Sequence, residues 1–288
     1  MRTDGSGSDN IEDRRGMGGV RGRRGLVGGG LGALIAVVVA LFFGIDPRVV
    51  LGLLGAADTA LPQASAPVQG KRGVPTDDMG RFVAVVLSDT EQTWQRKFAA
   101  AGRAYVAPTL VLFDDATPTA CGVGQSAMGP FYCPLDRKLY IDLRFFNELR
   151  SRFGAPGDFA QAYVIAHEVG HHVQNQLGVM DKTDRLRERL GAAESNAVSV
   201  RVELQADCLA GVWAADARSR GVLEVGDAEE ALRAAAAIGD DTLQRRSQGR
   251  IVPDAFTHGT AEQRMHWFQT GLTRGDIAAC DTFARESP

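Results

Sequence analysis

The feature that most constrains this sequence is a helical pattern with histidines on a mostly apolar surface. Over residues 158–178 large apolar side chains fall on most sides of the expected helix, at Phe159, Tyr163, Val164, Ile165, Val169, Val173 and Leu177. The segment His167-Glu168-Val169-Gly170-His171 lies inside this stretch. A helix of this kind has to be buried, and buried imidazoles need polar partners. We therefore expect a globular domain built around this helix.

The spacing of the two histidines predicts a metal site. Residues four apart on a helix differ by about 40° and rise about 6 Å, so His167 and His171 can converge on one ion. Glu168 lies about 100° round the helix from His167, where it can reach a water on that ion as a general base. His172 is about 140° away from His167 and should point elsewhere. The alternative is two core histidines that bond backbone carbonyls.

A catalytic zinc takes three protein ligands and keeps one position for water, so a third ligand is expected downstream. Glu203 is the best candidate, and Asp207 lies four residues later on the same helical face. We expect Glu203 to bind the ion and Asp207 to accept an N–H from a metal-bound histidine. One alternative reverses the two roles. Another places both carboxylates on a solvated face beside Arg201.

His258 is a further catalytic candidate. Thr260 and Gln263 have capping-box spacing, which places His258 in the loop that enters a helix. From such a loop it can donate a hydrogen bond to the oxyanion of a tetrahedral intermediate. A purely structural hydrogen bond is the alternative.

An uncharged run from Gly25 to Gly44 follows a cluster of arginines at Arg14, Arg15, Arg21, Arg23 and Arg24. A helix over this run reaches about 30 Å, the thickness of the hydrocarbon layer. We expect a single-pass transmembrane anchor at 25–44, and the positive-inside rule places the N-terminus in the cytoplasm and the catalytic domain outside the cell membrane. A cleaved signal peptide and a twin-arginine export signal are the alternatives.

The remaining composition divides the chain further. Residues 1–24, rich in Gly, Ser, Asp and Arg, are expected to be a disordered cytoplasmic tail, and the proline-containing residues 45–75 a linker. The folded domain then covers 76–288. Its patterns predict a helix capped by Thr76 or Asp77, a strand at 109–113, a hairpin from 129–134 and 139–143, and helices at 158–178, 183–220 with an interruption, 227–246 and 261–273. The predicted fold class is α+β, preceded by one transmembrane helix.

The four cysteines have no C-x-x-C spacing, and all follow the expected anchor. Disulfides are therefore favoured over a second zinc site, although the sequence leaves three pairings open. Cys121 with Cys133 is the natural local loop, which leaves Cys208 with Cys280. Free buried thiols are the alternative.

Several segments resemble the neutral zinc metallopeptidase family of bacterial membrane-anchored proteins, over nearly the whole chain. They are SDNIEDRR at 8–15, CGVGQSAMGPFYCP at 121–134, GDFAQAYVIAHEVGHH at 157–172, ELQAD at 203–207 and FTHGT at 256–260. The resemblance implies a zincin-like metallopeptidase domain with Zn²⁺ as cofactor. The Glu203 segment is also similar to that of thermolysin-like and CAAX-processing enzymes, which implies Glu203 as ligand and Asp207 as its support. Thr257-His258 looks like a Thr/Ser-His-Pro segment of the CAAX-processing group, with Gly259 in place of the proline.

These observations predict a zinc metallopeptidase that hydrolyses a peptide or protein substrate, with Glu168 as the general base. A net charge of −3 and a pI near 6.0 argue against nucleic acid as a partner. A non-catalytic zinc-containing scaffold or peptide-binding protein of the envelope is the alternative from another class. Hydrolysis of a non-peptide amide would use the same metal chemistry.

Overall fold

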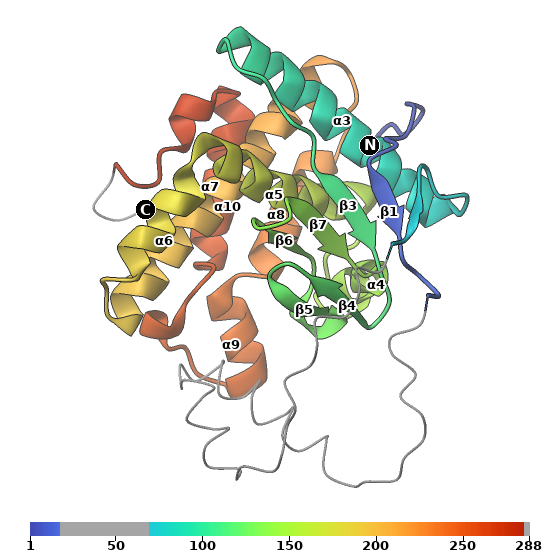
Figure 1. The fold of residues 1–288 in the computed structure, drawn as a ribbon. Helices are drawn as coiled ribbons and strands as arrows, with labels where there is room; N and C mark the ends of the chain where they lie inside the picture. Colours follow the sequence, from blue (N-terminus) through green and yellow to red (C-terminus); the bar gives the residue numbers. More distant parts are fainter. Residues whose placement is uncertain (18–68, 285–288) are drawn as a thin grey trace, which may run out of the picture. The chain divides into compact units, whose positions relative to one another are not determined.

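The computed structural model describes residues 1–17 and 69–284 (Figure 1). In this part of the chain a small sheet lies against a group of helices, so the α+β prediction is confirmed. The strands are β1 (Ile11–Asp13), β2 (Lys71–Arg72), β3 (Thr109–Leu112), β4 (Ala116–Thr119), β5 (Gly122–Gln125), β6 (Phe131–Cys133) and β7 (Lys138–Ile141). The helices are α3 (Asp78–Ala100), α4 (Arg144–Ser151), α5 (Asp158–Leu177), α6 (Val179–Arg187), α7 (Ala192–Ser219), α8 (Asp227–Ala237), α9 (Asp240–Gln248) and α10 (Ala261–Arg274). Short 3-10 turns are η1 (Ser126–Met128), η2 (Pro253–Ala255) and η3 (Ile277–Cys280).

Local signals place most elements where they were expected. Asp77 caps α3 by accepting a hydrogen bond from the Gly80 amide at 2.9 Å. The predicted hairpin consists of β6 and β7 in antiparallel register. The interruption expected within 183–220 separates α6 from α7. The helix expected at 227–246 is instead divided into α8 and α9.

The main sheet has the order β2-β1-β3-β7-β6, and its two faces carry separate hydrophobic clusters. Alternate residues of β3 and β7 point to opposite faces of the sheet. One set joins the main core with the helices: Leu110, Leu112, Leu139 and Ile141. The other set packs with Phe131: Val111, Phe113, Cys133 and Tyr140. The β4–β5 pair lies against this second cluster, since a Cβ at Gly124 would lie 2.3 Å from Cζ of Phe131.

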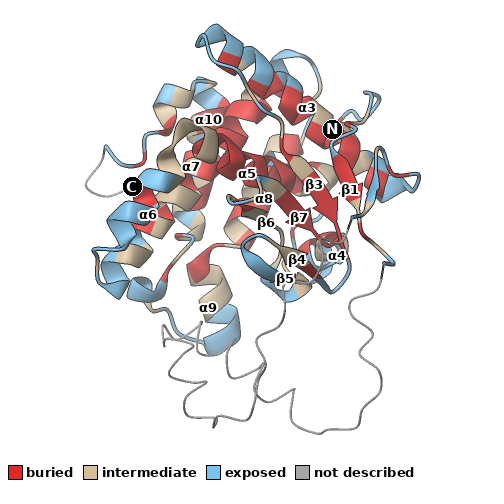
Figure 2. Cartoon of the chain, viewed as in Figure 1, coloured by how far each residue is buried: buried red, intermediate tan, exposed pale blue. Residues whose placement is uncertain are grey.

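Helix α5 runs through the main core, and Figure 2 shows it among the buried elements. It approaches α7 closely at Gly170, where a Cβ would lie 2.9 Å from the Ala206 carbonyl oxygen. Helix α7 in turn approaches α10 at Gly271, where a Cβ would lie 1.9 Å from the Cys208 carbonyl oxygen. These glycines therefore allow the backbones of three helices to meet at short distance.

The N-terminal segment differs from its prediction. Residues 1–17 are part of the folded unit, so they are not a disordered tail, and the domain does not begin at residue 76. Strand β1 pairs in parallel with β3 and antiparallel with β2, and Ile11 is buried in the main core. Glu12 bonds Arg14 and Lys138, both at 2.7 Å. The segment has few apolar residues, so it is held to the domain mainly by backbone pairing and buried ion pairs.

The predicted transmembrane helix and the single-pass location are corrected. Residues 25–44 lie outside the described residues, and none of the described helices is long and apolar enough to cross a bilayer. A single crossing would also place residues 1–17 and 69–284 on opposite sides of the membrane. Both segments instead contribute strands to one hydrogen-bonded sheet. The described residues therefore have the α+β fold class, and the predicted transmembrane helix has no counterpart among their helices.

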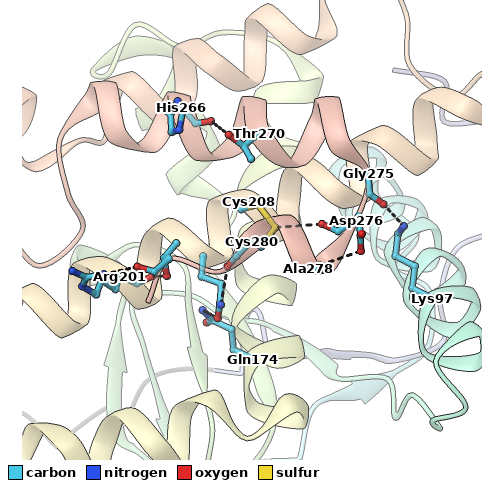
Figure 3. The surroundings of a disulfide bond; sticks show 12 residues. Lys97, Gln174, Arg201, Cys208, His266, Thr270, Gly275, Asp276, Ala278 and Cys280 are labelled. Atoms are coloured by element: carbon cyan, nitrogen blue, oxygen red, sulfur yellow. Dashed lines mark hydrogen bonds between the residues drawn. A yellow bond between two sulfur atoms is a disulfide. The ribbon is translucent and has the colours of Figure 1, made fainter. Parts of the chain in front are cut away.

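Two disulfides form, with the favoured pairing. Cys121 bonds Cys133 and joins the start of β5 to the end of β6, while Cys208 bonds Cys280 and joins α7 to η3 (Figure 3). None of the cysteines is a free thiol. The alternative of free buried thiols is excluded.

Candidate metal centre

Helices α5 and α7 bring three expected ligand residues together. His167 Nε2 lies 3.1 Å from one oxygen of Glu203, and His171 Nε2 lies 3.4 Å from the other. The donor atoms of His167, His171 and Glu203 all lie within 4.8 Å of one another. The one-turn spacing on α5 supplies the two imidazoles, and the close α5–α7 approach at Gly170 brings the carboxylate to them.

The neighbouring His172 is directed away from this group, as expected. Its Nδ1 lies 3.0 Å from the Tyr132 hydroxyl and its Nε2 lies 2.7 Å from the Val106 carbonyl oxygen. Burial lowers its pKa to about 4, so the ring is neutral near pH 7. Through Tyr132, His172 links β6 to the helix that carries the paired imidazoles.

A buried ionic group supports His167. Its Nδ1 lies 2.8 Å from Asp207, and Arg264 of α10 donates two hydrogen bonds to the same carboxylate, from Nε at 2.8 Å and Nη2 at 2.9 Å. The Tyr163 hydroxyl also donates to Asp207. Asp207 is 0% and Arg264 2% exposed. Burial lowers the pKa of His167, but the Asp207 carboxylate, with Glu203, more than offsets this and raises it to about 10 without metal.

A neutral side chain supports His171. Its Nδ1 lies 2.9 Å from Oε1 of Gln174, one turn further along α5. Gln174 donates from Nε2 to the Val202 carbonyl oxygen at 2.7 Å and to Oε1 of Gln205 at 3.0 Å. Both imidazoles therefore have a partner at Nδ1 and direct Nε2 toward Glu203.

Glu168 lies beside this group, next to His167 on α5, and is 7% exposed. Burial raises the pKa of its carboxyl, while the nearby histidines act in the opposite direction. A carboxyl with a raised pKa next to a metal site is suited to accept a proton from water.

His258 lies in the loop before α10, and the predicted capping box of Thr260 and Gln263 is confirmed. Its side chain is 50% exposed. Asp240 accepts hydrogen bonds from the backbone amides of Thr257, His258 and Gly259 and lies 3.3 Å from Nδ1 of His258. The partial desolvation of the His258 ring lowers its pKa, but the carboxylates of Glu203 and Asp240 outweigh this effect and raise the pKa. His258 is thus near enough to the ligand group to be influenced by its charge.

The donor set fits a divalent zinc ion. Two imidazole nitrogens and one carboxylate are typical of a catalytic zinc site, and each imidazole has an acceptor at Nδ1 that leaves the Nε2 lone pair for the ion. A second group of acidic side chains, Asp158, Asp227 and Glu230, comes together at the start of α5. The Met1 ammonium contacts Asp158 and Asp227, and Glu230 accepts from the Phe159 amide, so that group has structural partners.

Sequence reasoning missed three residues of this region. They are Arg264, Gln174 and Asp240, and both Arg264 and Asp240 reach their site residue through the tertiary fold rather than through spacing along one helix. Only Gln174 had a local signal, because it follows His171 by three residues and therefore shares its helical face.

Comparison with known proteins identifies the family. A family model described as "Putative neutral zinc metallopeptidase" matches residues 1–283, and the chain belongs to this family. A protein of Escherichia coli strain K12 named "Uncharacterized protein YpfJ" is 49% identical over 284 residues, which are 96% of each chain. "Uncharacterized protein Rv2575" of Mycobacterium tuberculosis strain H37Rv is 42% identical over 258 residues, 85% of each chain. No solved structure matches.

Proposed function

We propose that the protein is a zinc-dependent metallopeptidase in which His167, His171 and Glu203 hold the ion and Glu168 is the general base. The observation that carries this proposal is the convergence of three donor side chains within 4.8 Å of one another, with Glu168 on the adjoining helical position. The family description supports zinc as the cofactor and peptide hydrolysis as the reaction class.

When bound, zinc supplies a Lewis acid that lowers the pKa of a coordinated water to about 7. Glu168 accepts the proton of the attacking water at its carboxylate and passes it to the leaving amine nitrogen. Asp207 holds His167 in the Nδ1–H tautomer, so that Nε2 remains a ligand. His258 acts as an imidazolium, a form that its raised pKa favours: its Nδ1–H faces Asp240, and its Nε2–H donates a hydrogen bond to the oxyanion.

The proposal for substrate binding concerns the edge of the main sheet. Among the described strands β6 is the terminal strand beside β7, and the Tyr132–His172 contact fixes it against α5. Backbone pairing with such an edge binds peptides with little dependence on their side chains. We propose β6 as the strand that positions a peptide or protein substrate.

The test is Glu168→Gln in the full chain. The variant should retain zinc, because Glu168 is not a ligand, and should lose about 100-fold or more in rate on an unfolded protein substrate, the usual contribution of a general base. Glu188→Gln, an exposed change at the end of α6, is the matched control and should keep full activity. Full activity in Glu168→Gln would exclude this mechanism. Chelator-insensitive binding of peptide without cleavage by the wild-type protein would favour the scaffold hypothesis.

A further inference from the structure

A run of amide groups continues outward from His171. Gln174 accepts from the ring, donates to Gln205, and Gln205 donates from Nε2 to the Cys280 carbonyl oxygen at 2.9 Å. We propose that Gln174 and Gln205 form an amide relay that fixes His171 as the Nδ1–H tautomer and so positions its Nε2 for metal. The proposal rests on the metal site proposed above and adds a positioning device to it.

Two backbone carbonyls set the direction of the relay. A carbonyl oxygen only accepts, so the Val202 oxygen, 2.7 Å away, requires the NH₂ of Gln174 on its side. The oxygen of Gln174 then faces His171, and the ring nitrogen Nδ1 must carry the proton. The Cys280 oxygen fixes Gln205 in the same way and leaves its oxygen toward Gln174. Each position therefore needs a side chain with both a donor and an acceptor, which the glutamine amide provides without a change of ionisation.

The far end of the relay is anchored in several ways. Cys280 is joined to Cys208 of α7 by a disulfide, and Figure 3 shows Gln174 and Cys280 around that bond. Two residues further on, Thr282 exchanges hydrogen bonds with Arg201, whose backbone oxygen accepts from the Thr282 hydroxyl at 2.7 Å. Cys280 and Thr282 thus contact α7 on both sides of Glu203 in the sequence. The acceptor for Gln205 is held to the same helix that carries the third ligand.

Because Gln174 is buried, the loss of its hydrogen bonds would leave His171 without a replacement partner. The side chain is 0% exposed, so water cannot replace a lost partner of His171 without entering the core. Without an acceptor at Nδ1, the ring is free to rotate or to take the Nε2–H tautomer, which cannot bind metal through Nε2. Gln174 is a positioning residue in this account, because it acts on the ion through His171.

The first experiment compares zinc affinity in full-length variants by chelator competition. Gln174→Met keeps the length of the side chain and removes all three hydrogen bonds of the amide group, and should bind zinc about 10–100-fold more weakly. Gln174→Glu restores an acceptor for His171 and should bind more tightly than Gln174→Met. Gln161→Met is the control, because Gln161 lies on the same helix and bonds the Gly157 carbonyl instead; its affinity should equal that of the wild type.

Equal affinity in the wild type and Gln174→Met would overturn the relay, as would a Gln174→Glu variant no tighter than Gln174→Met. Failure of the wild-type protein to bind zinc would instead overturn the proposed function, so the two failures are distinguishable.

A second measurement does not depend on any variant folding. Nitrogen-15 NMR of the zinc-loaded wild-type protein should show the His171 ring with its proton on Nδ1. A proton on Nε2 would overturn the relay.

Discussion

The two imidazoles of the candidate metal centre have hydrogen-bond partners of different chemistry. His167 contacts a buried carboxylate that is paired with the Arg264 guanidinium, whereas His171 contacts a neutral amide that continues to a second amide. Buried charges cost free energy unless all partners are present, while a buried amide costs less to desolvate. Loss of the hydrogen-bond partner should therefore have different consequences at His167 and at His171. The His167 side should contribute more to stability and to ligand basicity, and the His171 side should mainly fix geometry.

The largest effect is expected from breaking the ionic side. Arg264→Met removes the cation that donates twice to Asp207 and leaves that carboxylate buried with fewer partners. We expect a loss of about 3–5 kcal/mol in the free energy of unfolding, measured by urea denaturation of the metal-free protein. Arg274→Met, an exposed change at the end of the same helix, is the control. If Arg264→Met lost no more free energy of unfolding than the control, the Arg264–Asp207 pair would contribute nothing to stability.

Asp207→Asn compares the partner of His167 directly with the partner of His171. The variant keeps the shape of the side chain but removes the charge that holds His167 Nδ1–H. Zinc affinity should fall by about 10–100-fold, and by more than in Gln174→Met, because a carboxylate is the stronger acceptor. Competition with a chelator measures the zinc affinity of each variant. A smaller loss in Asp207→Asn than in Gln174→Met would reverse the proposed order.

Gly170→Ala tests the geometry that both sides share. The new methyl would meet the Ala206 carbonyl oxygen at 2.9 Å and force α5 and α7 apart. Overpacking of this kind costs about 1–3 kcal/mol and should also weaken zinc binding by moving Glu203. Gly5→Ala, whose Cβ would make an ordinary contact of 3.8 Å with Val85, is the control. Unchanged stability and zinc affinity in Gly170→Ala would contradict the close-approach argument.

The last prediction, similar in size to that for Gly170→Ala, uses pH to test a buried ion pair outside the candidate metal centre. Glu12, in the N-terminal strand, is another buried carboxylate; burial raises its pKa, but hydrogen bonds from Arg14 and Lys138 outweigh this and lower it to about 2. A depressed pKa stabilises the fold above the unfolded value near 4.5, and the contribution is lost as pH falls through about 2. Glu12→Gln should therefore reduce the decline in stability between pH 4.5 and 2, by about 1–3 kcal/mol. Urea unfolding across this range measures it, and an unchanged slope would contradict the buried pairing of β1.

The sequence allowed the grouping of His167, His171 and Glu203 to be predicted, because residues four apart share one face of a helix. His167 and His171 are one turn apart, and Glu203 and Asp207 repeat that interval on a second helix. The direction of His172 away from the group followed from the same geometry. Arg264 could not be predicted as the partner of Asp207, because 57 residues separate them and only the packing of α10 on α7 brings them together.

The N-terminal segment shows the opposite case. Strand β1 has three residues, and its parallel partner β3 lies about one hundred positions later, so no local pattern announces the pairing. Its charged residues suggested disorder, yet Glu12 and Arg14 are buried as a pair. Composition alone cannot distinguish a solvated charge from a paired one.

X-ray absorption at the zinc edge of the purified full chain tests the central claim most directly. We predict stoichiometric zinc with two imidazole nitrogens and oxygen ligands, no sulfur, and loss of the ion in Glu203→Ala. Sulfur in the coordination shell, or an unchanged zinc spectrum in Glu203→Ala, would contradict the site formed by His167, His171 and Glu203.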